Sequence, residues 1–243
     1  MNDIHISIKR KSYHDLPDVS ATIADLDLTL SAGEFVCLVG PSGCGKTTLL
    51  NIIAGIDKDY VGAITMTQHT ALKIGYVFQN PRLLPWCTVR KNIELVLTDP
   101  VNGQDIDDLL ADMQLTQVQD EYPERLSLGM ARRVAIIRAF AINPALLLMD
   151  EPFVSLDAAT ARQVRTLLLK LWQHRPHTVL LVTHDLRDAI ALADKLIFLS
   201  ANPMQVIMQI PVPIARADRE DEALIEAFRQ QLKSECSALM TYL

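Results

Sequence analysis

The chain has 243 residues, of which 49% are hydrophobic and 21% are charged, and its formal net charge is −6. This length suits one large domain or a domain with a subdomain, and the apolar fraction is sufficient for a sizeable core. The acidic balance argues against bare nucleic acid as the main partner, because nucleic-acid-binding domains usually carry a basic face.

The apolar runs and the cysteines point to a cytoplasmic protein. No run approaches the ~18 residues that cross a bilayer, and the first residues form no basic-then-apolar signal segment. The four cysteines make no C-x-x-C pair, and Cys44 lies in a glycine-rich loop, which disfavours a disulfide or zinc framework. We therefore expect a reduced protein.

The first part of the chain predicts strands. Residues 4–9 and 21–30 alternate apolar and polar side chains, as half-buried strands do, and residues 35–39 form a continuous apolar run typical of a buried strand. Tyr13 and His14 lie between the first two strands. For each ring two interpretations are open: it stacks on a purine, or it is an ordinary aromatic side chain of a loop.

A glycine-rich loop follows the strand at 35–39 and precedes an apolar, helical run at 49–54. Its glycines allow backbone N–H groups to point at phosphate oxygens, and the helix N-terminus adds partial positive charge. Lys46 can reach the β- and γ-phosphates, and the Thr47 hydroxyl can bind Mg²⁺. The alternative is a glycine-rich turn that contains a lysine by chance. It would not explain why a strand precedes the loop and a helix follows it, as in phosphate-binding loops. The loop matches the pattern G-x-x-x-x-G-K-[ST] and consists of Gly40, Pro41, Ser42, Gly43, Cys44, Gly45, Lys46, Thr47 and Thr48.

Strands are predicted at 63–67 and 74–78, and a helical composition from 88 to about 119, with helices at 89–97 and 105–113. Gln79 follows the second strand. Its amide either reaches Mg²⁺ and the attacking water or is an ordinary polar loop group. Trp86 lies in the proline-containing, apolar segment at 81–89. It either packs within the helical block or belongs to a surface that meets a partner.

Ser127 is a plausible N-cap for a helix that continues to residue 140, with apolar side chains at 134, 137 and 141 on one face. Arg132, Arg133 and Arg138 lie elsewhere on that helix. The following strand, 146–150, is wholly apolar, which is typical of the centre of a parallel sheet.

Two carboxylates end this strand. Asp150 can hold Mg²⁺, and Glu151 can polarise the attacking water as a general base. The alternative is an ordinary strand-to-loop turn, which fits less well in a chain that also carries a phosphate loop.

The remaining chain continues the alternation of strands and helices, with helices at 158–173 and 186–193, strands at 179–182, 196–199 and 205–210, and an amphipathic tail at 218–243. His184 follows the strand at 179–182, where it either hydrogen-bonds the γ-phosphate or has a structural role. Polar residues at the carboxyl ends of the strands predict an α/β layered domain with its site at that edge.

With these segments in this order, the chain resembles the ATP-binding cassette (ABC) ATPases over nearly its whole length. The segments are the phosphate loop, the Q-loop glutamine Gln79, a signature segment at 126–130, the Walker B residues Asp150 and Glu151, a D-loop at 155–157 and the switch histidine His184. The phrases at 77–86 and 150–153 are most similar to ATPase subunits of bacterial importers of the nitrate/sulfonate/taurine type.

The chain also departs from the family pattern. Where the family signature reads L-S-G-G-Q, this chain has Leu128 for the first glycine and Met130 for the glutamine, while Ser127 and Gly129 are kept. Tyr13 is the best match for the aromatic that stacks on adenine, although residues 16–19 look inserted after it.

The resemblance implies a phosphate-loop NTPase core of mainly parallel sheet at about 1–79 and 141–215, with an N-terminal antiparallel β part. It also implies an inserted helical subdomain at about 80–140 and a helical tail at 216–243. ATP and Mg²⁺ are the implied cofactors. Two copies would sandwich two ATP molecules, with Mg²⁺ held by Thr47, Gln79 and Asp150. Lys46, Gln79, Glu151 and His184 would be catalytic, Tyr13 and Asp157 would line the nucleotide site, and Ser127 and Gly129 would act in the opposite copy's site.

The implied partners are transmembrane permease subunits and a periplasmic or extracellular solute-binding protein, with no nucleic acid. The location would be the cytoplasmic face of the inner membrane, and the region around 80–125 would touch the permease. Three alternatives stay open: a soluble ABC ATPase not coupled to transport, the ATPase of an exporter or lipid-trafficking system, and a phosphate-loop kinase. A kinase would need neither the signature segment nor His184.

Overall fold

The computed structural model describes residues 3–13, 21–66, 72–97, 103–201 and 203–235. The chain forms two compact units. Unit 1 comprises Met1–Leu72 and Thr178–Leu243, and unit 2 comprises Lys73–His177. The two segments of unit 1 come from opposite ends of the chain, so unit 2 is an insertion between them. The boundaries predicted for core, helical subdomain and tail stay a prediction.

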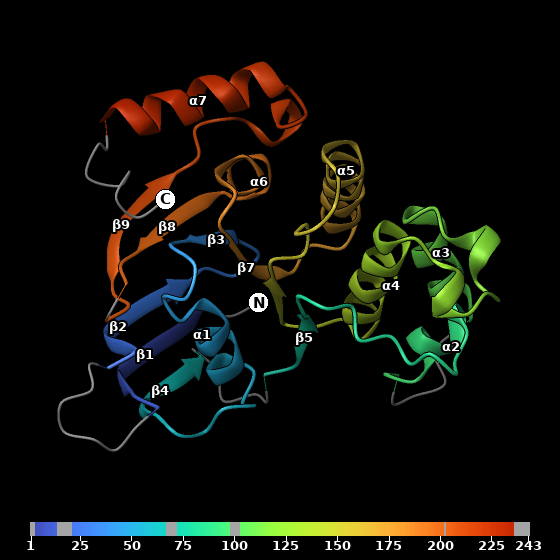
Figure 1. Ribbon diagram of the computed structural model, residues 1–243, viewed down its shortest axis with the longest axis horizontal. Helices are drawn as coiled ribbons and strands as arrows, with labels where there is room; N and C mark the ends of the chain where they lie inside the picture. The colour runs from blue at the N-terminus through green and yellow to red at the C-terminus, as the bar shows by residue number, and fades with distance from the viewer. Residues whose placement is uncertain (1–2, 14–20, 67–71, 98–102, 202, 236–243) are drawn as a thin grey trace. The chain divides into compact units, whose positions relative to one another are not determined.

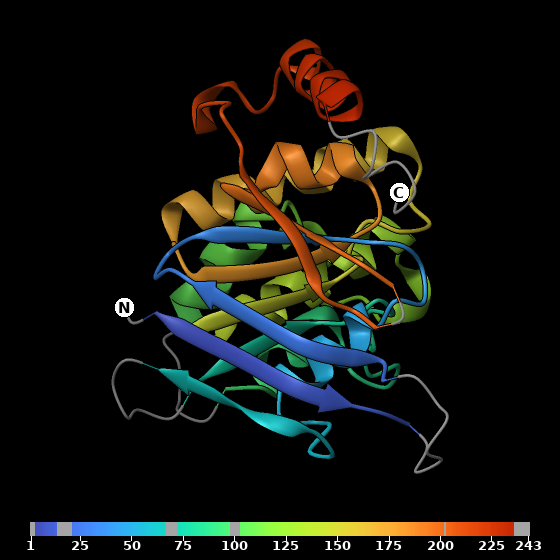
Figure 2. The same cartoon turned by 90° about the vertical axis from the view of Figure 1, so that its left-hand side faces the viewer.

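Unit 1 contains a three-stranded antiparallel sheet of order β2-β1-β4 (Figure 2). The strands are β1 (Ile4–Lys11), β2 (Ile23–Leu30) and β4 (Val61–Met66). In β1 the side chains of Ile4, Ile6 and Ile8 are buried while His5 is exposed. This is the alternation that the sequence predicts for a strand with one covered face.

The other strands of unit 1 lie in the order β7-β3-β8-β9. They are β3 (Phe35–Val39), β7 (Thr178–Thr183), β8 (Lys195–Leu199) and β9 (Val206–Pro211). β3 is parallel to β7 and β8, and β9 is antiparallel to β8. Every residue of β3 and β7 is buried, as expected for parallel strands that are covered on both faces.

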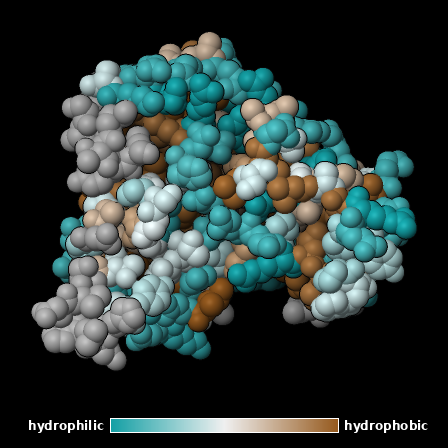
Figure 3. Space-filling model, in the orientation of Figure 1, coloured by the Kyte–Doolittle hydropathy of each residue, from teal (hydrophilic) through white to brown (hydrophobic). Residues whose placement is uncertain are grey.

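The helices of unit 1 follow the strand ends. They are α1 (Lys46–Ile53), α6 (Leu186–Leu192), the 3₁₀ turn η3 (Arg216–Asp218) and α7 (Glu222–Glu235). α6 packs against β3, and α7 packs on α6 (Figure 1). Ile225, Phe228 and Leu232 of α7 are buried, while hydrophilic side chains cover most of its outward surface (Figure 3). This amphipathic helix explains the pattern of the C-terminal tail.

Unit 2 contains the parallel pair β5 (Ile74–Val77) and β6 (Leu146–Asp150) together with four α-helices and two 3₁₀ turns among its described residues. The helices are α2 (Val89–Glu94), α3 (Gly103–Asp112), α4 (Leu128–Ala141) and α5 (Ala158–His174), and the 3₁₀ turns are η1 (Thr116–Val118) and η2 (Pro123–Arg125). No helix within the described ranges of either unit is long and apolar enough to cross a bilayer.

The predicted α/β class, with mainly parallel strands and an antiparallel N-terminal part, is confirmed. One predicted element is wrong in its extent: α2 ends at Glu94, not at residue 97. The N–H groups of Val96 and Leu97 donate to the carbonyls of Ile93 and Glu94, three residues back. The chain therefore tightens from α-helical into 3₁₀-type bonding after Glu94.

Candidate functional site

The phosphate loop connects β3 to α1. Gly43 has φ +79° and Gly45 has φ +109°, left-handed values that glycine adopts without steric strain. A Cβ on Gly45 would also lie 3.0 Å from Cγ2 of Thr22. Gly45 is the N-cap residue of α1 and supplies no side-chain cap. The loop thus presents the start of a helix to a ligand, which is a favourable place for a phosphate.

Lys46 is held inside this loop. Its side chain is buried, and its Nζ donates to the carbonyl oxygens of Gly40 and Pro41, both at 2.8 Å. Nζ also lies 3.9 Å from Sγ of Cys44. Burial raises the pKa of the Cys44 thiol, against the opposing effect of Lys46, so the thiol is protonated at neutral pH. A buried ammonium and backbone N–H donors together fit a polyphosphate.

Tyr13 lies beside the same loop. Its hydroxyl is 2.7 Å from Oγ1 of Thr48, and its ring remains 58% exposed. Lys11 Nζ lies 4.9 Å from the ring centroid and is paired with Asp57 and Asp59. The ring is therefore available for stacking next to the loop, and its role with adenine stays a prediction. His14 and residues 16–19 lie outside the described residues.

His184 lies at the same edge of unit 1 as the phosphate loop. Val39, the last residue of β3, is paired with Thr183, the last residue of β7, so the two strands end together. His184 is exposed, and the next residue, Asp185, caps α6 by accepting from the N–H of Arg187 at 2.8 Å. The parallel register accounts for this proximity, as the sequence pattern predicts.

Unit 2 brings the other predicted catalytic residues to one edge of its own strand pair. Val77 is paired with Met149, so Gln79 and Asp150 follow neighbouring strand ends. Gln79 is exposed, Asp150 is buried, and Glu151 is half-buried with φ +44°.

The chemistry of these side chains fits Mg²⁺. The charge of Asp150 also acts on a neighbouring side chain. The pKa of the Tyr76 hydroxyl is raised, first by burial and then by this charge. The described residues hold no cluster of three or more carboxylate, histidine or cysteine ligands. Mg²⁺ in nucleotide sites is typically bound by one or two carboxylates together with phosphate oxygens and water, so a single carboxylate beside an amide suffices.

The signature segment begins α4. Ser127 is the N-cap, and its Oγ accepts from the N–H of Met130 at 3.2 Å, which confirms the predicted cap. Leu128 is 42% exposed. Gly129 is buried, and a Cβ added there would lie 2.5 Å from Cγ2 of Thr160. With threonine at 160, close packing of α4 on α5 therefore requires glycine at this position.

Asp157 caps α5. Its Oδ1 accepts from the N–H groups of Ala159 and Thr160, and its Oδ2 accepts from the Thr160 hydroxyl at 2.6 Å. These bonds, with the Thr160 hydroxyl as the largest cause, lower the pKa of the Asp157 carboxyl. The predicted contact of Asp157 with nucleotide stays a prediction.

Sequence reasoning missed the role of Arg132. This arginine is only 3% exposed, and its guanidinium donates to the carbonyls of Phe78 and Val154. A signal was available, because Arg132 lies three residues after Gly129 and such residues share a helix face. Nothing in the sequence showed that this face is buried against loops.

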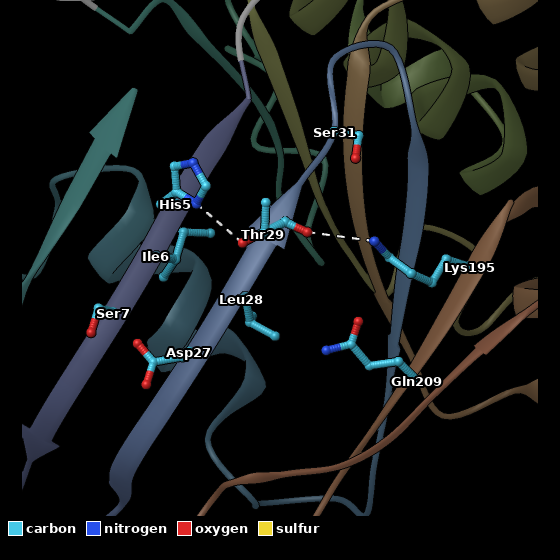
Figure 4. A pocket seen from close by; sticks show the side chains of 9 residues that line it. All are labelled: His5, Ile6, Ser7, Asp27, Leu28, Thr29, Ser31, Lys195 and Gln209. Carbon is cyan, nitrogen blue, oxygen red and sulfur yellow. Dashed lines mark hydrogen bonds between the residues drawn. The ribbon is translucent and has the colours of Figure 1, made fainter. Parts of the chain in front are cut away.

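A polar pocket of about 380 Å³ lies elsewhere in unit 1 (Figure 4). His5 Nδ1 is 3.1 Å from Oγ1 of Thr29, and Lys195 donates to Glu34 at 2.9 Å. None of the predicted nucleotide-site residues lines it, so this pocket is separate from the phosphate loop. Its lining consists of His5, Ile6, Ser7, Asp27, Leu28, Thr29, Ser31, Lys195 and Gln209.

Comparison with known proteins agrees with these features. The chain is 38% identical to the aliphatic sulfonates import ATP-binding protein SsuB of Bacillus subtilis (strain 168), over 96% of this chain and 93% of that protein. It is 41% identical to the aliphatic sulfonates import ATP-binding protein SsuB 1 of Pseudomonas syringae pv. syringae (strain B728a), over 85% of this chain and 86% of that protein.

A solved structure has a similar fold. The dimeric ATP-binding cassette MJ0796, in a post-hydrolysis state bound to ADP and Pi, superposes with a TM-score of 0.73 at 29% identity, over 87% of this chain and 100% of that one. Residues 23–154 match the ABC transporter family. The chain therefore belongs to the ABC transporter family, as an ATP-binding cassette that binds and hydrolyses ATP.

Proposed function

We propose that this chain energises the import of a small anionic organic solute, with aliphatic sulfonates as the first candidates. Two of the relatives that carry the sulfonate import name are 38% and 41% identical to it over most of its length. The structural observation that supports ATP as the energy source is the phosphate loop itself, with its buried Lys46 and left-handed glycines.

In the proposed mechanism the loop N–H groups and Lys46 bind the β- and γ-phosphates. Thr47, Gln79 and Asp150 are the residues that would hold Mg²⁺, and the ion would neutralise charge on the phosphate oxygens. Glu151 accepts the proton of the attacking water. Asp150 ends β6 and Glu151 begins the following loop with a left-handed φ, so the two carboxylates lie on different elements and can serve two purposes.

Further residues complete the proposed nucleotide site. The His184 imidazole hydrogen-bonds the γ-phosphate and responds to its loss, and the exposed Tyr13 ring stacks on adenine. Asp157 of the D-loop lines the site.

We further propose that two copies form the ATPase, by analogy with the dimeric cassette that superposes on this chain. Ser127 and Gly129 of each copy then act on the nucleotide held by the other. The exposed Leu128 lies between them and would face the opposite copy.

The membrane partners are permease subunits on the cytoplasmic side, supplied with solute by a periplasmic or extracellular binding protein. The segment at 81–89 and the neighbouring helices form the proposed contact with the permease. The chain would thus work as a peripheral subunit at the cytoplasmic face of the inner membrane.

The test is solute uptake by cells that lack this gene and carry either the wild-type chain or Lys46→Ala. We expect the wild type, but not the variant, to restore growth on an alkanesulfonate as the sole sulfur source, with equal growth of both on sulfate. Nitrate and taurine uptake are measured in parallel. Loss of nitrate uptake instead would overturn the sulfonate assignment, whereas loss of taurine uptake would keep it, because taurine is itself an aliphatic sulfonate. Unchanged uptake of all three would overturn the importer assignment.

A further inference from the structure

Arg132 connects the signature helix to two other loops of unit 2. It lies in the second turn of α4, and its Nη1 donates to the carbonyl of Phe78 at 3.2 Å. Its Nη2 donates to the carbonyl of Val154 at 3.4 Å. Phe78 directly precedes Gln79, and Val154 lies three residues after Glu151. One guanidinium therefore joins the segments that carry the proposed water-positioning and general-base residues.

This guanidinium is an unusual buried group. It is 3% exposed, and its Nε has no hydrogen-bond partner among the described residues. Burial lowers its pKa, although the group remains charged at neutral pH. A buried cation bonded only to carbonyls is a poor source of stability, because such bonds offset only part of the cost of removing the charge from water. This arrangement suggests a role for Arg132 other than stability.

The Gln79 segment is also held on its far side by α4. Arg138 donates to the carbonyls of Pro81 and Arg82 at 2.7 and 2.9 Å. The ring of Phe78 is stacked between the Tyr76 ring, at 4.0 Å, and the Arg82 guanidinium, at 3.9 Å. The backbone on both sides of Gln79 is thus fixed to the same helix.

The segment after Glu151 is strained. Glu151 has φ +44° and Ser155 has φ +66°, left-handed values that are unfavourable for residues other than glycine. The Val154 carbonyl lies between these two residues and accepts from Arg132. The helix that follows this segment, α5, packs closely on α4, where Gly129 faces Thr160. External bonds of this kind are what a strained segment needs to keep its conformation.

We propose that Arg132 is a positioning residue that keeps Gln79 and Glu151 in fixed register with the signature segment, so that the three move as one block. The planar guanidinium has two parallel-facing nitrogens and can bridge two carbonyls. Lysine carries the same charge on a single nitrogen and cannot hold both loops in this geometry.

The test compares Arg132→Lys and Arg132→Met with Arg133→Met. Arg133 is the adjacent arginine of the same helix, and its Nη1 donates at 3.0 Å to the carbonyl of Met113, outside the nucleotide-binding segments. We expect both Arg132 variants to lose about 10-fold or more in kcat, a loss typical of misplaced catalytic groups. We expect KM for MgATP to stay within about 3-fold, because Lys46 and the phosphate loop are untouched. Arg133→Met should keep kcat within about 3-fold.

Hydrogen exchange distinguishes positioning from general destabilisation. In Arg132→Lys, the amides of residues 78–80 and those of 151 and 153–156 should exchange faster together, whereas in Arg133→Met neither segment should change. The proposal is overturned if Arg132→Lys keeps the wild-type kcat, if only one of the two segments loosens, or if Arg133→Met loses as much kcat at an equal fall in melting temperature. Arg132→Lys retains the positive charge and is the more conservative variant. It therefore still tests the proposal if Arg132→Met does not fold.

Discussion

Glu151 is the residue on which the proposed hydrolytic step depends most directly. It follows the buried Asp150, is itself half-buried, and has a left-handed backbone with φ +44°. We expect Glu151→Gln to bind ATP normally but to hydrolyse it at least ~100-fold more slowly, because the amide cannot accept the proton of the attacking water. Single-turnover kinetics and calorimetry measure the two effects separately. Near-normal turnover would assign the base to another residue.

Individual site residues differ in how far the sequence reveals them. The sequence predicts four of them because each lies at or just after the end of a short apolar strand, and strand ends gather at one edge of a parallel sheet. These four are Gln79, Asp150, Glu151 and His184. Arg132 could not be read in this way. The side chain of Arg132 is buried because α4 packs against two loops. The local sequence pattern does not indicate this packing.

The segment that joins β5 to α2 presents Trp86 to solvent. The side chain is 73% exposed, so the interpretation that it packs within the helical block is wrong. Asn92 holds this segment, accepting from the N–H of Leu84 at 2.7 Å and donating to the carbonyl of Cys87 at 3.0 Å. A rigid loop with an exposed tryptophan is a good candidate for an interface hot spot.

We expect Trp86→Ala to leave the melting temperature and ATP affinity unchanged while weakening assembly with the permease by about 10-fold or more, the effect of losing a hot-spot side chain. Pull-down with membrane subunits measures this loss. Leu224→Ala is the control, because Leu224 is an exposed apolar residue of α7 in the other unit, at 43% exposure. Equal loss in both variants would remove the segment from the permease contact.

The start of α6 is attached to α7 by ion pairs around Glu226. Its carboxylate accepts from Arg187 of α6 at 2.8 Å and from Arg229 of its own helix. The hydrogen bonds from Arg229, then Gln230 and then Arg187 lower the pKa of Glu226 from 4.5 to about 2. Because the folded pKa is depressed, this stabilisation is present above the unfolded pKa and is lost as the pH falls through about 2.

We therefore expect Glu226→Gln to lower the melting temperature at neutral pH by a small amount, as is usual for solvent-exposed ion pairs. The difference from wild type should shrink steadily as the pH is lowered from about 4.5 to about 2. Scanning calorimetry over that range measures it. A difference that grows on acidification would mean that Glu226 does not hold α7 in this way.

At the scale of the whole molecule, the proposed sites are shared between two copies. A mixed dimer of one Ser127→Arg chain and one Lys46→Ala chain should keep at most one intact site. We expect its ATPase rate to fall well below that of wild type. Ser127 also caps α4, so Ser127→Thr, which retains the cap, serves as the control for helix stability. Full activity of an isolated monomer would contradict the shared site.

The arrangement of the chain into units is the property that local patterns reveal least. Unit 1 is assembled from both ends of the chain and unit 2 from the middle. Strands β3 and β7 are paired although Phe35 and Val179 lie far apart in the sequence. Apolar runs identify each strand. Which strands become neighbours in a sheet depends on packing between segments far apart in the sequence, and the pattern within one segment does not show it. Only the resemblance to a family predicted a core divided between about 1–79 and 141–215.

The contact between Gly129 and Thr160 has a genetic consequence. An alanine at 129 would collide with a single methyl group, Cγ2 of Thr160, whereas the Thr160 hydroxyl is the atom that bonds Asp157. Serine at 160 would remove the methyl and keep the hydroxyl. A selection for revertants of Gly129→Ala should therefore yield Thr160→Ser as a second-site suppressor. The double variant should recover ATPase activity that Gly129→Ala alone lacks. Revertants that map only to position 129 would show that this glycine is needed for contacts beyond the helix pair. Across related chains, we expect the residues at 129 and 160 to vary together. A larger side chain at one position should occur only where the side chain at the other is small.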